Sequence, residues 1–409
     1  MSQDRITSRE QVEAINSHYS TPNYSPLPVV ISEGEGIWVR DVDGNEYMDM
    51  LSSYSALNQG HCHPELVKAM KEQCERLSLT SRAFMNDQLG LFLKDVCEIT
   101  GMDRTLPMNS GAEAVETAIK GMRKWGHEEK GLPEDKGEII VANENFHGRT
   151  VTIISFSSEE LYKKGFGPYT PGFKIVDFND ADALEEAITD ETIGFLVEPM
   201  QGEAGIRIPD DGYLSDVEEI CRDHDILLAL DEIQTGLGRT GEMFAADHEN
   251  VTPDLYILGK ALSGGMYPVS AVAGRDDLME RFTPGTHGST YGGSPLAAAV
   301  GRTALRVIQD ENMVENASEL GPYFRDGLRA MDADPVKEVR GKGLFIGVEI
   351  KEEYGEARPY AKKIIENGVL AKDTHGTVLR FAPPLIIKKD QIDEALRRIE
   401  PVLKNFRPE

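Results

Sequence analysis

The stretch PDLYILGKALSGG, residues 253–265, joins a short apolar run to a lone lysine. The run 255–258 has the length and composition of a buried strand, and Gly259 ends it. Lys260 follows directly. Lysine is rarely buried, whereas ligands of α/β proteins bind at the carboxyl ends of the strands. The stretch therefore predicts one strand of an α/β sheet with a functional lysine at its end.

Other short apolar runs surround this strand along the chain. They alternate with segments of helical period such as 112–126, and this alternation is typical of a mainly parallel α/β sheet. The predicted strands of this region cover residues 138–142, 193–198, 226–232, 255–258 and 269–274.

The two ends of the chain have a different pattern. After about residue 305, long helical patterns and a few strands predict a smaller α+β domain. Near the start, GIWVRDVDGNEYMDM predicts a hairpin that turns at Asp43 and Gly44. We therefore expect an N-terminal segment (1–55) that packs with the small domain, a large domain (56–304) and the C-terminal small domain (305–409).

Composition limits the possible partners and the compartment. The formal net charge of −27 argues against nucleic acid or an anionic membrane as a partner, and any anionic substrate must be bound by local arginines. No run approaches the roughly 18 apolar residues of a membrane span, and the polar start lacks the apolar segment of a secretory signal. The four cysteines form no CxxC pair and are expected to be reduced, buried thiols. We expect a cytoplasmic protein.

Three motifs offer alternative functions, and each fails on its pattern. A phosphate-binding P-loop around Lys260 would need glycine at Asp254 and serine or threonine at Ala261. GLGRTG (236–241) matches a dinucleotide fingerprint, but it does not open a helix directly after a strand. GHCHP (60–64) offers metal ligands without a second cluster at a suitable spacing. We therefore predict no metal site.

A fourth combination is consistent with one cofactor. Asp231 ends the apolar run LLALD, and Lys260 follows the next strand, so adjacent parallel strands would bring both side chains to one crevice. A buried carboxylate keeps a pyridine nitrogen protonated, and a lysine forms a Schiff base with an aldehyde. Ser110, Gly111 and Ala112 lie at a predicted helix start, whose free N–H groups bind phosphate. An aldehyde, a pyridine and a phosphate together define pyridoxal 5'-phosphate. Separately, Asp231 and Ser110 could each be only a helix cap.

The motifs of the chain extend this interpretation to a family. LSSYSALNQGHCHP, LTSRAF, FHGRT, VEPMQGEAGI, LDEIQTGLGRTG, LGKALSGGMYPVSAV, HGSTYGG, RGKGL and LRFAPPL resemble the signatures of the fold type I, subgroup III aminotransferases. The resemblance covers roughly residues 20–405. It implies a large domain with a mainly parallel seven-stranded sheet and a smaller α+β domain. SSYSALNQGHCHP and NYSPLPVV are narrower, and they resemble the branch of the family that acts on ornithine.

The resemblance implies roles for residues at the cofactor ring. Lys260 would bind the cofactor aldehyde and later move the proton, and Asp231 would keep the ring nitrogen protonated. Gln234 would contact the phenolic oxygen, and Phe146 would stack on the ring. The family pattern departs at His147, where some members carry tryptophan.

The resemblance also implies a phosphate site that two subunits share. Ser110, Gly111 and Ala112 would bind the phosphate from one subunit, and Thr290 would reach it from the other. A homodimer with its sites at the interface follows from this role of Thr290.

The resemblance implies a substrate end as well. Arg149 would bind the α-carboxylate of the substrate with Tyr24 beside it, Tyr54 would mark the ornithine branch, and Glu203 with Arg380 would form a switch pair. The expected reaction moves the δ-amino group of L-ornithine to 2-oxoglutarate. The alternative is an aminotransferase for acetylornithine, succinylornithine or γ-aminobutyrate. A cofactor-binding protein without catalytic activity would be expected to lack some of the catalytic residues, and all of them are present.

Overall fold

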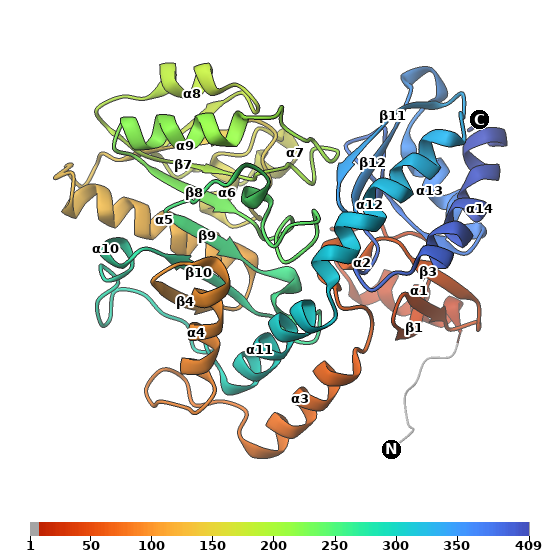
Figure 1. Cartoon of the computed structure of the whole chain (residues 1–409), viewed down its shortest axis with the longest axis horizontal. Coiled ribbons are helices and arrows are strands. Elements are labelled where there is room, and N and C mark those ends of the chain that lie inside the picture. The colour runs from red at the N-terminus through yellow and green to blue at the C-terminus, as the bar shows by residue number, and fades with distance from the viewer. Residues whose placement is uncertain (1–7, 409) are drawn as a thin grey trace.

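A seven-stranded sheet forms the centre of the larger part of the computed structural model, which describes residues 8–408 (Figure 1). Six of the seven strands run in the same direction, and only the strand at 270–274 runs antiparallel to both of its neighbours. The predicted mainly parallel seven-stranded sheet is confirmed. In spatial order the strands are β4 (Arg104–Met108), β10 (Ser270–Gly274), β9 (Leu255–Leu258), β8 (Leu227–Asp231), β7 (Thr192–Val197), β5 (Glu138–Ala142) and β6 (Phe173–Val176).

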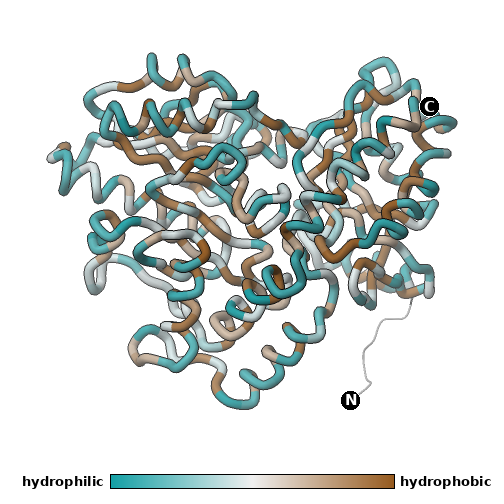
Figure 2. The backbone as a smooth tube through the Cα atoms, in the orientation of Figure 1, coloured by the Kyte–Doolittle hydropathy of each residue, from teal (hydrophilic) through white to brown (hydrophobic). Residues whose placement is uncertain are grey.

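Both faces of this sheet are covered by helices, so its central strands are apolar on both sides. In β8, Leu227 and Ala229 point into one hydrophobic cluster and Leu228 and Leu230 into the other. Figure 2 shows the hydrophobic colour concentrated along these strands. The helices of this part are α3 (Pro64–Arg76), α4 (Leu89–Thr100), α5 (Gly111–Glu128), α6 (Val151–Ser155), α7 (Glu160–Lys163), α8 (Ala181–Ala187), α9 (Tyr213–Asp223), α10 (Asp276–Met279) and α11 (Pro295–Asp310), with 3-10 turns η1 (Ala245–Glu249) and η2 (Lys260–Ser263).

A four-stranded antiparallel sheet forms the centre of the C-terminal part. Its order is β11 (Val336–Lys342), β12 (Phe345–Ile350), β15 (Val378–Phe381) and β14 (Lys372–Thr374). The surrounding helices are α12 (Met313–Ala330), α13 (Ala357–Glu366) and α14 (Lys389–Asn405), with the short turn η3 (Glu352–Tyr354).

The N-terminal elements lie against this C-terminal part, as their red and blue colours show in Figure 1. The predicted hairpin is present, and its second strand pairs in parallel with a short strand of the C-terminal part. The elements are α1 (Arg9–Tyr19), β1 (Ile31–Glu35), β2 (Trp38–Asp41), β3 (Glu46–Asp49), α2 (Ser52–Ser55) and the partner strand β13 (Val369–Leu370). The division into domains at 55 and 304 stays a prediction.

Two expectations about smaller features require correction. Strands β4 and β6 were not predicted, although they lie at the two edges of the large sheet. All four cysteines are free, but Cys62 and Cys74 are exposed rather than buried. Cys62 lies in a turn with a φ of 51°, and Cys74 follows the buried Gln73 on the outer face of α3. Among the described residues, no helix combines the length and apolar character needed to cross a bilayer.

Candidate active site

Asp231 and Lys260 lie at the same edge of the large sheet. Asp231 ends β8 and is in register with Ile257 of β9, and Lys260 comes three residues after Ile257 at the start of η2. The backbone of Lys260 has a φ of 44°, in the left-handed region that lysine seldom adopts. The chain thus turns sharply after the strand and keeps the lysine beside the aspartate, as the sequence predicted.

The amine of Lys260 loses its proton more easily than that of an ordinary lysine. Burial is the main reason that its pKa is lowered to about 8, and the positive charge of Arg380 acts in the same direction. The carboxylates of Glu203 and Asp231 oppose this decrease. A lysine with such a pKa has a substantial neutral fraction near neutral pH, and only the neutral amine can attack a carbonyl carbon.

His147 is the direct partner of Asp231. Its Nδ1 lies 2.6 Å from Asp231 Oδ2, and both side chains are buried. Burial alone would lower the pKa of His147, but the hydrogen bond to Asp231 and the charge of Asp231 raise it overall. Asp231 Oδ1 also accepts from the backbone N–H of Ile233 at 3.1 Å. The carboxylate is therefore fixed from two sides.

Glu198 forms a second buried carboxylate near this pair. It directly follows β7, and its oxygens accept from the backbone N–H groups of Phe146 at 3.0 Å and Gly202 at 3.4 Å. Burial raises the pKa of Glu198 to about 7; the neighbouring His147 opposes this increase and Asp231 adds to it. Glu198 thus ties together the segments that carry Phe146 and Glu203.

The start of α5 provides an anion site. Ser110 and Glu113 form a capping box in which the Ser110 hydroxyl accepts from Glu113 N–H at 3.2 Å. The N–H groups of Gly111 and Ala112 have no acceptor within the described chain, so they remain free for an anion. A Cβ on Gly111 would lie 2.9 Å from Ile233 Cδ1, so glycine makes room for the side chain that follows Asp231.

Phe146 and Arg149 flank Gly148, where the segment before α6 packs against Ala112 at the start of α5. The guanidinium carbon of Arg149 lies 5.6 Å from the ring centroid of Phe146 and 4.2 Å from that of Tyr162. Arg149 is exposed, and no carboxylate of the described residues forms a salt bridge with it. The aromatic rings orient this arginine while its charge stays available.

Glu203 and Arg380 form a salt bridge, as the switch-pair interpretation requires. Arg380 donates from Nη1 and Nη2 to Glu203 Oε1 at 2.9 and 2.8 Å, and Nη2 also donates to Gln234 Oε1 at 2.9 Å. Arg380 is only 1% exposed. Burial favours the neutral form of Glu203, but the charges of Arg380 and Lys260 hold its pKa below the usual value.

Tyr54 covers this salt bridge. Its ring centroid lies 5.4 Å from the guanidinium carbon of Arg380 and 5.8 Å from Lys372 Nζ. All four residues of α2 have positive φ, from 45° to 70°, so α2 is a left-handed turn that presents this ring. Burial and the charge of Glu203 raise the pKa of Tyr54, so its hydroxyl remains protonated.

The last two predicted site residues form no hydrogen bond with this cluster. Tyr24 is 75% exposed, although it is near enough to Tyr54 to contribute to the raised pKa of that hydroxyl. Thr290 is also exposed, one residue after Ser289, whose hydroxyl accepts from Asn109 Nδ2 at 2.9 Å. The functional placement of both therefore remains a prediction.

The donor set fits pyridoxal phosphate. A buried carboxylate suits a protonated ring nitrogen, free amides at a helix start suit a phosphate, and a partly neutral lysine suits an aldehyde. His147 Nε2 is buried without a hydrogen-bond partner in the described chain. Among residues 8–408, no group of three or more His, Cys, Asp or Glu side chains is arranged to hold a metal ion.

Fold and site thus define a pyridoxal-phosphate-dependent transferase. The family model of the class-III aminotransferases matches residues 19–403, and the chain belongs to this family. It is 54% identical to the ornithine aminotransferase of Brevibacillus brevis over 394 residues, which cover 96% of this chain and 97% of the relative.

Solved structures agree with this assignment. A Toxoplasma gondii ornithine aminotransferase, described with partial occupancy of PLP at its active site, superposes with a TM-score of 0.96 at 47% identity and covers 98% of this chain and 95% of its own. An acetylornithine aminotransferase from Elizabethkingia anophelis superposes with a TM-score of 0.89 at 44% identity. The match covers 97% of this chain and 99% of the other.

Sequence reasoning missed several members of the cluster. Glu198 lay within the quoted motif VEPMQGEAGI, and its place directly after an apolar strand was the available signal. His147 was noted only as a departure from the family, and Lys372 carried no signal at all. Their contacts join segments that are far apart in the chain.

Proposed function

We propose that this aminotransferase moves the δ-amino group of L-ornithine to 2-oxoglutarate, giving glutamate 5-semialdehyde and glutamate. The observation that carries the proposal is the contrast between the two arginines. Arg149 is exposed and free of carboxylates, whereas Arg380 is buried and paired with Glu203. Ornithine has one carboxylate and glutamate has two. Arg149 can bind the carboxylate that both substrates share, and Arg380 can bind the second carboxylate of glutamate when Glu203 releases it. A single site can therefore serve both substrates.

The residues at the ring have the following proposed tasks. The cofactor, when bound, supplies an aldehyde that takes up the amino group and a protonated ring that draws electrons. Asp231 holds a proton on the ring nitrogen, and His147 keeps the carboxylate in position. Lys260 moves a proton at Nζ, for which a pKa near 8 is suited. Phe146 stacks on the ring.

The remaining proposed contacts orient the cofactor and the substrate. Gln234 accepts from Arg380 at its oxygen and donates from Nε2 to Glu203 at 3.5 Å, and the second hydrogen of Nε2 can donate to the phenolic oxygen. Ser110, Gly111 and Ala112 bind the phosphate. On the substrate side, Arg149 binds the α-carboxylate with Tyr24 nearby, and the Tyr54 hydroxyl contacts the α-amino group of ornithine.

A substrate panel tests the proposed reaction. Ornithine, N-acetylornithine and γ-aminobutyrate are compared with 2-oxoglutarate as the acceptor. We expect kcat/KM for ornithine to exceed that for the other donors by about tenfold or more, since a site built for a polar group discriminates strongly. A preference for N-acetylornithine would replace the proposed substrate and keep the aminotransferase class.

We also propose a cytoplasmic homodimer in which Thr290 completes the phosphate site of the partner. Mixing Lys260→Ala protein with Thr290→Ala protein tests this arrangement after subunit exchange. If Thr290 acts across the interface, one site of each mixed dimer has both residues and activity returns. If Thr290 acts within its own subunit, mixing restores nothing.

A further inference from the structure

The loop that carries Glu203, residues 202–207, is attached to the C-terminal sheet. In the chain it follows β7 of the large sheet. The side chain of its residue Ile206, however, is completely buried against Phe345 and Ala382 of the C-terminal part. Thr374 Oγ1 of β14 donates to the Glu203 carbonyl at 2.8 Å. The loop therefore rests on the same sheet as Arg380, the partner of Glu203.

A gap in the side chains of this sheet accommodates the loop. Arg340 of β11, Gly347 of β12 and Arg380 of β15 are direct cross-strand neighbours, so their side-chain positions share one face. Gly347 leaves the middle of this row open. A Cβ on Gly347 would lie 3.1 Å from Ile206 Cβ and 3.3 Å from the Gly205 carbonyl oxygen. The loop backbone thus lies over Gly347, between the two arginines.

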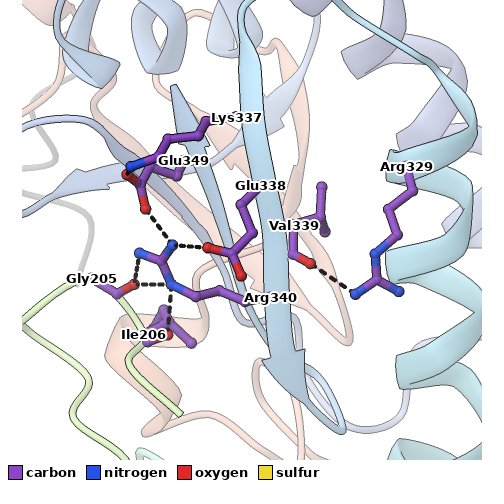
Figure 3. Close-up of polar contacts among 8 residues, drawn as sticks. All are labelled: Gly205, Ile206, Arg329, Lys337, Glu338, Val339, Arg340 and Glu349. Atoms are coloured by element: carbon purple, nitrogen blue, oxygen red, sulfur yellow. Dashed lines mark hydrogen bonds and ion pairs between the residues drawn. The ribbon is translucent and has the colours of Figure 1, made fainter. Parts of the chain in front are cut away.

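Arg340 binds the loop through its backbone (Figure 3). Its Nε donates to the carbonyls of Gly205 at 3.1 Å and Ile206 at 3.0 Å, and its Nη2 donates to Gly205 at 2.7 Å. Glu338 and Glu349 bind the other side of the guanidinium, whose side chain is only 16% exposed. Arg340 is therefore itself fixed, and it makes no contact with the Glu203 side chain.

We propose that Arg340 is a positioning residue that sets the choice between the two substrates. With the backbone of the loop fixed by Arg340, Gly347 and Thr374, the Glu203 side chain alone can leave Arg380 and return to it. Glu203 then covers Arg380 whenever a substrate with a single carboxylate enters the site. The inference rests on the proposed function, because it assumes that substrates with one and with two carboxylates alternate in this site.

Arg340→Met tests the proposal, with Arg329→Met as the matched control. Arg329 binds the same strand, donating to the Val339 carbonyl at 2.8 Å, and it touches no atom of the loop (Figure 3). Hydrogen exchange of the peptide 199–208 is measured in the cofactor-free and the loaded protein. The Ile206 amide donates to the Gly202 carbonyl and the Arg207 amide to the Gln201 carbonyl, so both bonds depend on the shape of the loop, and we expect Arg340→Met to speed their exchange by about tenfold or more. Arg329→Met should leave it unchanged.

Single-turnover kinetics then separate positioning from general support. In Arg340→Met the ratio of kcat/KM for ornithine to that for glutamate should fall about tenfold, because Arg380 is masked less often. Arg340→Lys keeps the positive charge and one donor atom, so it should recover part of the ratio of ornithine to glutamate activity. Equal losses in both half-reactions, or unchanged exchange of the loop, would overturn the proposal. If the wild-type protein prefers another amine donor, the proposed function fails, and the ratio for that donor still decides the role of Arg340.

Discussion

Arg380 contacts a single oxygen of Glu203, because Nη1 and Nη2 both donate to Oε1 at 2.9 and 2.8 Å. Oε2 has no hydrogen bond within the described chain. A fork-to-fork pair would use both carboxylate oxygens and would be more strongly oriented. The one-oxygen contact therefore suits the proposed opening of this pair, in which Gln234 stays bound to Arg380 after Glu203 leaves.

Removal of Glu203 should shift the enzyme towards glutamate. In Glu203→Ala, Arg380 is permanently available for a second carboxylate, which should favour the glutamate half-reaction by about 1.5–3 kcal/mol, or 10- to 100-fold. Ornithine should then also react at its α-amino group. Rapid mixing with each substrate and detection of pyrroline-2-carboxylate measure both effects.

Glu366→Gln is the control for this experiment. Glu366 is an exposed carboxylate of α13 that pairs with Lys363 and touches neither the masked pair nor Arg340. It should leave both half-reactions close to wild type. Unchanged glutamate rates and unchanged regiochemistry in Glu203→Ala would show that the switch lies elsewhere.

Tyr54 should contribute to ornithine specificity through its hydroxyl. Tyr54→Ile removes the hydroxyl and the ring over Arg380, and it should weaken kcat/KM for ornithine by about 1–3 kcal/mol. Tyr54→Phe keeps the ring and isolates the hydroxyl. γ-Aminobutyrate lacks an α-amino group and should lose less in both variants. Equal losses for ornithine and γ-aminobutyrate would exclude the specificity role.

The convergence of Asp231 with Lys260 and the helix start at Ser110 were predictable because local patterns encode them. Asp231 and Lys260 each follow an apolar run, and parallel neighbouring strands end at one edge of a sheet. Ser110 with Glu113 is a capping box that can be read from four residues. In these cases the chain's periodicity and the rules of sheet topology specify the contact.

The contacts between distant segments were not predictable in this way. Arg340 binds Gly205 across 135 positions, and no periodicity connects the two. Strand β4 escaped prediction because Pro107 lies within it, which only an edge strand tolerates. The polar Lys174 similarly interrupts β6, the opposite edge. Partners brought together by tertiary packing have to be seen in the structure.

His147 should stabilise both the fold and the bound cofactor through Asp231. His147→Phe leaves Asp231 buried without its Nδ1 partner, which should lower the free energy of unfolding of the cofactor-free protein by about 1–3 kcal/mol. Cofactor dissociation should also speed up. Urea unfolding and the loss of visible absorbance on dialysis measure the two effects.

His224→Phe is the matched control for the His147 experiment. The exposed pair of His224 with Glu185, at 3.3 Å, should contribute less than about 1 kcal/mol. A His147→Phe protein as stable as this control would show that Asp231 does not depend on the histidine.

Lys260 should titrate far below an ordinary lysine in the cofactor-free protein. With a pKa of about 8 instead of 10.5, roughly a tenth of the amine is neutral at pH 7, compared with less than about 0.1% for the ordinary group. The rate at which a small acylating reagent modifies the Lys260 peptide should therefore rise with pH to a midpoint near 8, as followed by mass spectrometry. The same peptide in urea-unfolded protein should give a midpoint near 10.5.

Glu203 provides a test of the cause of this Lys260 titration. Its carboxylate stabilises the protonated amine and so raises the pKa of Lys260, in opposition to burial. Glu203→Gln removes that charge, and the midpoint of modification should move below 8. Glu366→Gln removes an exposed carboxylate of α13 that does not act on Lys260, and it should leave the midpoint in place. A midpoint near 10.5 in the folded protein would mean that the lysine is fully solvated, and the proton-transfer role proposed for it would lose its physical basis.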